Sequence, residues 1–228
     1  MNVKQFLTGF ILMFGLQLVI AQDELNIDYK EIKQIVTNND SEYYYPKLLK
    51  RFNAFDESLT LEEYALLYYG FSFQEDYLVN QPEEKKLSEL IKKEDYEGLI
   101  AECEKILKTN PVSLKANEKM GYALFKLGKS EEEWKKYQNR FRGLRKAIAY
   151  SGNGLTCETS FKVIYISDEY NLLYDYFDVS KIYSQSLTNE LCDKFVIEPS
   201  KYYQVNEVYF DISRKLIRQQ ELLDTNYD

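Results

Sequence analysis

The strongest constraint on the fold is a repeated helical pattern between Gln81 and Ala147, with a period of about 34 residues. In each copy, apolar residues recur at helical spacing on both sides of a turn, which predicts four helices arranged as two consecutive pairs. Two copies alone rarely form a stable array, because each pair needs a neighbour to cover its apolar face. We therefore expect the preceding segment to supply the missing layer, so that residues 22–149 form one helical domain.

The repeat resembles the tetratricopeptide type in its register. The matching positions are a second-helix set with its closing proline in the first copy, and the helix and turn glycines in the second: Tyr96, Leu99, Cys103, Ile106, Pro111, Gly121 and Gly128. Glu133 departs from the pattern, because a small alanine is expected there. The resemblance implies a concave surface for a protein or peptide partner, along the inner faces of the first and third helices.

Further helices are predicted before the repeat. Apolar residues at helical spacing indicate a helix over residues 26–36. Ser41 can cap a second helix, in which Pro46 must lie in the first turn or cause a kink. Thr60 and Glu63 have the spacing of a capping box for a third helix, which Gly70 is expected to end.

The composition changes after residue 149. A Gly-rich turn at residues 151–154 is followed by segments rich in Val, Ile, Tyr and Phe. We predict strands over residues 160–166, 182–187, 194–198 and 205–212, and helices over 168–177 and 214–223. The chain is therefore expected to be α+β, with a tetratricopeptide-like helical array followed by a small antiparallel β-sheet, with helices on one face, over residues 150–228.

Residues 1–21 have the pattern of a signal peptide. Lys4 precedes an apolar run, and Ala21 ends a short segment suited to signal peptidase. The run is short for a membrane span, so we expect an exported mature chain, periplasmic or secreted, without stable membrane insertion. An uncleaved anchor is the alternative.

The charge and the absence of His limit the function classes. The chain contains 29 basic and 37 acidic residues and no His. This balance disfavours nucleic acid as a partner. Without His, the Ser-His-Asp and Cys-His systems and the HExxH metal motif are excluded. The basic run from Lys135 to Lys146 is interpreted as the solvated face of a helix, with an anion-binding patch as the alternative.

Three cysteines remain in the predicted mature chain. Cys103 falls on the inner face of a repeat helix and is expected to be buried as a free thiol. Cys157 and Cys192 are the candidate disulfide, and a loop of about 35 residues would stabilise the fold by ~3–4 kcal/mol.

Two polar motifs are candidates for chemical sites. The turn that contains Gly152 and Gly154 precedes a strand and lacks the Lys of a phosphate-binding loop, so we expect a structural turn. Glu158, Asp168 and Glu169 are the acids near this turn that could form a catalytic pair. Solvated surface is the favoured interpretation of these acids, and we predict no catalytic residue, cofactor or metal site.

The tyrosines offer a further alternative. The chain has 21 Tyr, most of which we expect to pack in the core with the hydroxyl at its edge. If Tyr43, Tyr45, Tyr202 and Tyr203 instead formed an exposed flat surface, they could bind a glycan.

Four stretches resemble domain-of-unknown-function family 4919, a set of exported proteins mostly from Bacteroidetes-type bacteria. They are "DESLTLEEYALLYYGFSF" (56–73), "SGNGLTCETSFKVIYISDEY" (151–170), "CDKF" (192–195) and "VYFDIS" (208–213). Members often carry Asp at the position of Asn153 and Ala at that of Ser160. The resemblance implies export and a two-part layout, and it implies no catalytic residue.

These observations favour an exported, non-enzymatic interaction protein that presents its helical surface to a protein or peptide. The alternatives are a carbohydrate- or envelope-binding module that uses exposed tyrosines, and a hydrolase based on carboxylates.

Overall fold

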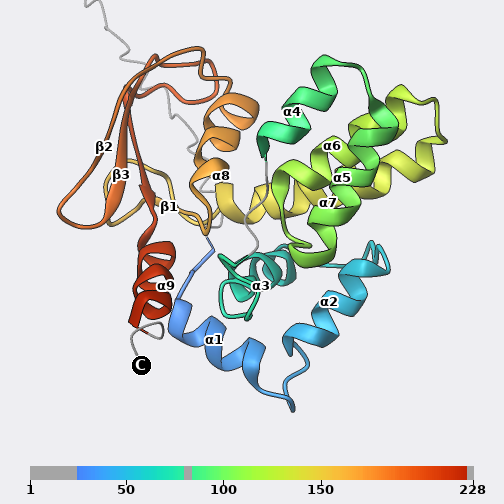
Figure 1. Ribbon diagram of the computed structural model, residues 1–228. Coiled ribbons are helices and arrows are strands. Elements are labelled where there is room, and N and C mark those ends of the chain that lie inside the picture. Colours follow the sequence, from blue (N-terminus) through green and yellow to red (C-terminus); the bar gives the residue numbers. More distant parts are fainter. Residues whose placement is uncertain (1–24, 80–83, 225–228) are drawn as a thin grey trace, which may run out of the picture.

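The computed structural model describes residues 25–79 and 84–224. The predicted signal peptide and the residues at the start of the repeat, Gln81 and Pro82, lie outside these ranges. Within them the fold is α+β, as predicted, with a run of helices followed by a small sheet (Figure 1). The first part contains α1 (Tyr29–Thr37), α2 (Tyr45–Asn53), α3 (Leu61–Phe71), α4 (Glu84–Lys92), α5 (Tyr96–Thr109), α6 (Leu114–Lys126) and α7 (Glu131–Ala149). The second contains β1 (Phe161–Lys162), α8 (Ile166–Asn171), the π-helical turn η1 (Leu172–Tyr176), β2 (Ile182–Leu187), β3 (Cys192–Ile197), β4 (Glu207–Asp211) and α9 (Ser213–Asp224).

Helix α3 starts at the predicted capping box. The Thr60 side chain accepts a hydrogen bond from the Glu63 backbone, and Glu63 accepts one from the Thr60 backbone. The prediction that Gly70 ends this helix is wrong, because α3 continues to Phe71. A Cβ atom on Gly70 would lie 3.0 Å from a methyl carbon of Val36 and 3.1 Å from the ring of Tyr45. The glycine therefore allows α3 to pack closely against α1 and α2.

Helix α2 starts later than predicted. Ser41 does not cap it, since the helix begins at Tyr45 after Tyr44 as the N-cap residue. The Ser41 hydroxyl instead accepts a hydrogen bond from the Tyr43 backbone at 3.0 Å, which fixes a turn. Pro46 lies in the first turn of α2, where its missing N–H costs no helical hydrogen bond.

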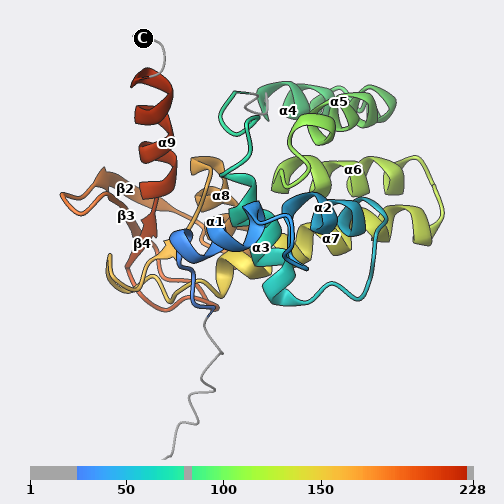
Figure 2. The same ribbon diagram turned by 90° about the horizontal axis from the view of Figure 1, so that it is seen from below.

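Helices α4 to α7 pack against one another in chain order, and Figure 2 shows α5, α6 and α7 as successive layers. Their starts follow local signals: Asp95 caps α5, Ser113 caps α6, and Ser130 caps α7. Gly128, with φ +67°, makes the turn between the last two helices. Glu133 completes a capping box with Ser130, which explains why a carboxylate stands at this repeat position.

A small core holds α4, α5 and α6 together. It consists of Leu87, Leu99, Cys103, Ile106, Ala116, Met120 and Ala123. Cys103 is a buried free cysteine. At Gly121 a Cβ atom would lie 3.1 Å from the backbone oxygen of Trp134, so this glycine allows α6 to approach α7 closely.

The sheet has the strand order β1-β4-β3-β2. β2–β3 and β3–β4 are antiparallel, but β1 pairs with β4 in parallel, so the sheet is mixed and not purely antiparallel. The first strand is also shorter than predicted, because the chain enters α8 at Ile166. Helix α8 covers one face of the sheet, where the Tyr170 ring meets Phe195 edge-on at 5.6 Å.

A larger core joins the two predicted parts of the chain. It contains side chains from α1 to α3, from the end of α7 and from the sheet. Three tyrosine hydroxyls of the α3 region reach across it: Tyr68 donates to Asp168 at 2.6 Å, Tyr69 to the Lys162 carbonyl at 3.0 Å, and Tyr77 to the Ile164 carbonyl at 2.6 Å. The helical and sheet parts therefore share a core across residue 149.

Cys157 and Cys192 form a disulfide, with their Cα atoms 5.8 Å apart. It ties the loop before β1 to the start of β3. Within the described ranges, none of the helices combines the length and the apolar character needed to cross a membrane.

The basic run on α7 is only in part the solvated face that the sequence predicts. Lys135 and Lys136 are partly exposed and pair with Glu131 and Glu132. Arg140 contradicts the prediction, since it is 7% exposed and donates two hydrogen bonds to the Phe52 carbonyl. The signal of this burial in the sequence is its place three residues after Tyr137 and four before Leu144, on the apolar stripe of α7.

Candidate functional site

An open groove lies between α5 and α7, over the C-terminal end of α6. We call it the helical groove, and its volume is about 580 Å³. Ile100, Ala101, Leu124 and Leu127 supply its apolar lining. The repeat register predicts a binding surface on the first and third repeat helices, whereas the walls of this groove are the second and fourth.

The sequence produces this groove through ordinary helix geometry. Residues Glu97, Ile100, Ala101 and Glu104 of α5 follow one another at spacings of three, one and three positions, so they share one helix face. The opposite face of α5 carries Leu99, Cys103 and Ile106 into the small core. The groove face is the remainder of the helix surface, and no motif in the sequence marks it.

The rim of the helical groove is acidic. Glu97, Glu104 and Glu133 line it, against one basic residue, Lys129. Hydrogen bonds from the Ser130 side chain and backbone lower the pKa of Glu133, which keeps this carboxylate ionised at neutral pH. The groove therefore combines an apolar floor with a net negative rim.

The interpretation of the three acids near the Gly-rich turn as solvated surface is wrong for two of them. Asp168 and Glu169 lie buried on α8, whereas Glu158 is exposed on the loop before β1. Burial, followed by the charge of nearby Asp193, raises the pKa of Glu169 to about 10. Glu169 is therefore protonated at neutral pH. No sequence pattern indicates the proximity of Asp193, which lies on β3.

The surrounding hydrogen bonds indicate that Glu169 and Asp193 have a structural role. Gln185 donates to Asp193 at 2.9 Å and accepts from the Tyr170 hydroxyl at 2.5 Å. Asp168 accepts from the buried hydroxyl of Tyr68. A small polar cavity of about 170 Å³, lined by Asp168 and Asn171 among others, lies beside α8. In the described part of the chain, no group of three or more Cys, Asp and Glu residues is arranged to hold a metal ion.

The Gly-rich turn has a structural role. The backbone N–H groups of Asn153 and Gly154 both donate to the Thr159 carbonyl, so they are not directed toward an anion. Gly154 has φ +71°, and a Cβ atom there would lie 2.5 Å from the Phe161 ring. At Gly152, a Cβ atom would lie 2.4 Å from the Ser160 carbonyl oxygen.

The four candidate tyrosines for glycan binding do not form one exposed surface. Tyr45 is 3% exposed, and Tyr203 packs against the rings of Phe161 and Phe177. Only Tyr43 and Tyr202 of this set are exposed.

The sequence comparisons agree with the resemblance carried by the four stretches of the chain. The model of a family described as a domain of unknown function (DUF4919) matches residues 30–221. The chain belongs to this family. Neither a curated protein nor a solved structure matches it.

Proposed function

We propose that this chain is an exported, non-enzymatic interaction protein whose helical groove binds a basic, amphipathic helix of a partner protein. The observation that carries the proposal is the groove itself, with apolar side chains between acidic rims. A helix that carries Leu-type residues on one face and Lys or Arg beside them would match both features.

The repeat register supports an interaction role in general, although the helical groove lies on the second and fourth repeat helices. Helices α4 to α7 form two consecutive pairs in which Asp95, Gly121 and Gly128 have the local roles of a cap, a close approach and a turn. We interpret them as tetratricopeptide-like, a class of array that presents surfaces to peptides.

Export to the periplasm or the medium of a Bacteroidetes-type cell is part of the proposal. It rests on the signal-peptide pattern of residues 1–21. The disulfide between Cys157 and Cys192 is consistent with an oxidising compartment. An intact N-terminus on protein recovered from the cell envelope would contradict signal cleavage.

The binding proposal is tested with a short synthetic peptide of Leu and Lys, patterned as an amphipathic helix and labelled for fluorescence anisotropy. We expect it to bind, and to bind more weakly as salt is added, because the attraction to the rim is screened. A peptide of the same pattern with Glu in place of Lys should not bind.

A pair of variants distinguishes binding in the helical groove from non-specific electrostatic attraction to the protein surface. Ala101 is exposed on the groove face of α5, so Ala101→Arg adds bulk and a positive charge there without disturbing a core. We expect it to weaken binding by roughly tenfold or more. Gln219→Arg adds the same charge to an exposed position of α9 and is the matched control. Equal loss in both variants, or binding of both peptides, would remove the groove as the binding site.

The glycan alternative retains only Tyr43 and Tyr202 as exposed rings of its original set. The hydrolase alternative would have to use the buried acids of α8, of which Glu169 has no exposed surface. Neither has an observation that favours it over the groove.

A further inference from the structure

A second cavity lies between the α2–α3 connection and α7. We call it the arginine pocket, and its volume is about 220 Å³. Phe52, Phe55, Leu59 and Tyr64 supply apolar and aromatic walls, and Arg140 and Arg142 enter it from α7. It shares no lining residue with the helical groove, so a ligand of this pocket would be independent of the proposed function.

Arg140 is the unusual residue in this pocket. It is 7% exposed, and its guanidinium carbon lies 3.6 Å from the centre of the Phe55 ring and 4.5 Å from that of Phe52. Nε and Nη2 donate to the Phe52 carbonyl at 3.1 and 2.7 Å. This contact places a cation at the C-terminal end of α2, where the helix dipole stabilises it.

These contacts leave part of the guanidinium unused. An arginine has five N–H donors, and within the described residues Nη1 makes no hydrogen bond and Arg140 forms no ion pair. Nη1 is also not among the polar atoms sealed from solvent. A buried cation without a counter-ion is costly, so a free donor that solvent can reach indicates room for an anionic ligand.

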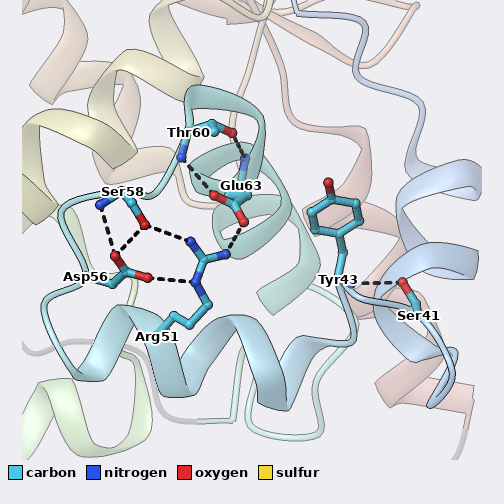
Figure 3. A network of polar contacts seen from close by, with 7 residues as sticks. All are labelled: Ser41, Tyr43, Arg51, Asp56, Ser58, Thr60 and Glu63. Atoms are coloured by element: carbon cyan, nitrogen blue, oxygen red, sulfur yellow. Dashed lines mark hydrogen bonds and ion pairs between the residues drawn. The ribbon is translucent and has the colours of Figure 1, made fainter.

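The acids near the pocket are mostly occupied. Figure 3 shows the carboxylate of Asp56 held by Arg51 and Ser58, with Arg51 also paired to Glu63. The side-chain hydrogen bonds from Ser58 and Arg51 lower the pKa of Asp56 to about 2. Arg51 therefore neutralises the Asp56 carboxylate, and Asp56 does not serve as the counter-ion of Arg140.

The remaining charges favour an anion. Lys136, which also lines the pocket, is paired with Glu132 at 2.8 Å. Arg142 contacts Gln138 through a hydrogen bond of 3.3 Å and adds a second guanidinium. Two guanidinium groups thus face one exposed carboxylate, that of Glu57.

We propose that the arginine pocket binds a carboxylate group carried on a small apolar or aromatic body. A guanidinium pairs well with the planar carboxylate through parallel hydrogen bonds, and the ring and Leu59 walls suit an apolar body. A phosphate dianion fits less well, because Glu57 and the net charge of −8 oppose a second negative charge. The carboxylate could belong to a free organic acid or to the C-terminus of a peptide.

The test uses the full mature chain and two ligands of the same shape. Phenylacetate carries the carboxylate, and phenylacetamide replaces it with a neutral amide. We expect phenylacetate to shift the NMR signal of the Arg140 Nε–H group in a saturable way and to raise the melting temperature. Phenylacetamide should bind about tenfold more weakly or not at all. N-acetylphenylalanine then represents a peptide C-terminus, and its affinity relative to phenylacetate distinguishes the two sources.

Three variants test whether phenylacetate binds in the arginine pocket. Arg140→Met should weaken phenylacetate binding at least about tenfold. Because this change also removes a contact to the end of α2, Arg142→Gln provides a second variant at an exposed position, with an expected loss of about threefold. Arg145→Met is the matched control, since Arg145 also lies over aromatic rings of α7 and η1 but outside the pocket.

Three results would overturn the proposal. The first is equal binding of phenylacetate and phenylacetamide. The second is a protein that binds inorganic phosphate but does not bind phenylacetate. The third is phenylacetate binding that is retained in both Arg140→Met and Arg142→Gln.

Discussion

The two cores of this molecule are assembled in different ways. The smaller core joins helices that are neighbours in the chain, from α4 to α6. The larger core joins α1 to α3 to a sheet about a hundred residues later, and tyrosine hydroxyls connect pairs separated by 87, 93 and 100 positions. Stacking of neighbouring helices needs little more than a repeated apolar pattern, whereas closing the larger core also needs specific polar contacts.

The difference can be measured, because the one Trp and the fully buried tyrosines lie in different regions. The chain has one Trp, Trp134, which contacts Phe125 of α6 and reports on the helical stack. The fully buried tyrosines Tyr68, Tyr69 and Tyr77 belong to the larger core. Trp fluorescence and the near-UV circular dichroism of tyrosine can therefore follow the two regions separately during unfolding.

The largest effect is expected from the proton that buried Glu169 retains in the folded state. Unfolded Glu titrates near 4.5 and folded Glu169 near 10, so between these values the folded state holds a proton that the unfolded state has lost. The stability must then fall as pH rises, by up to about 1.4 kcal/mol per pH unit, or about 4 kcal/mol from pH 5 to pH 8. Glu169→Gln keeps the shape and a donor, and should remove this slope in urea titrations.

Glu158→Gln, at an exposed acid of the same part of the chain, is the control and should leave the slope in place. If Glu169→Gln retained the slope, Glu169 would not hold the proton.

Removal of the disulfide should affect the larger core next most strongly. The double change Cys157→Ser and Cys192→Ser opens a loop with a sequence separation of 35, which should cost ~3–4 kcal/mol. The tyrosine signal should move to lower urea concentration more than the Trp134 signal. Identical shifts of both signals would mean that the two cores unfold as one unit.

Tyr68→Phe tests the polar connection between the two parts. The hydroxyl donates to Asp168 and accepts from the Ile164 backbone at 3.1 Å, so its loss removes one buried hydrogen bond from each of these two groups, at a cost of about 3 kcal/mol. Tyr43→Phe, at an exposed tyrosine, should change the free energy of unfolding by almost nothing. A similarly small effect of Tyr68→Phe would show that the apolar contacts alone close the core.

The smallest effect is expected in the helical stack. Ser130→Ala removes the side chain that caps α7, which should cost about 1 kcal/mol. The loss should appear in the Trp134 transition, four residues along the helix, and hardly in the tyrosine transition. Ser186→Ala, on the exposed strand β2, is the control for losing a serine hydroxyl.

The features that could be predicted from the sequence are those set by neighbouring residues. The capping box of Thr60 and Glu63, the Asp95 cap and the Gly128 turn depend on a few positions each, and the structure has all three. The end of α3 could not be predicted in this way. Gly70 usually signals a helix end, but here its missing side chain makes room for Val36 and Tyr45, which are distant in sequence.

The candidate sites are harder to predict for the same reason. The parallel pairing of β1 with β4 and the partnership of Glu169 with Asp193 bring together segments whose relation no local pattern records. Arg140 lies within a run of basic residues, and only its position on the apolar stripe of α7 separates it from its exposed neighbours. The groove face of α5 has the right spacing in the sequence, but its exposure depends on how α6 and α7 pack.

The long-range tyrosine contacts have a consequence for biosynthesis. While the chain is being made, α3 emerges with Tyr68 and Tyr69 well before their partners near Ile164 exist. The N-terminal helices cannot complete their core until the sheet segment has been synthesised, so the full fold is a late event. A nascent chain that has not yet completed its fold can still pass through a translocation channel as an unfolded polypeptide. The proposed export would require this property.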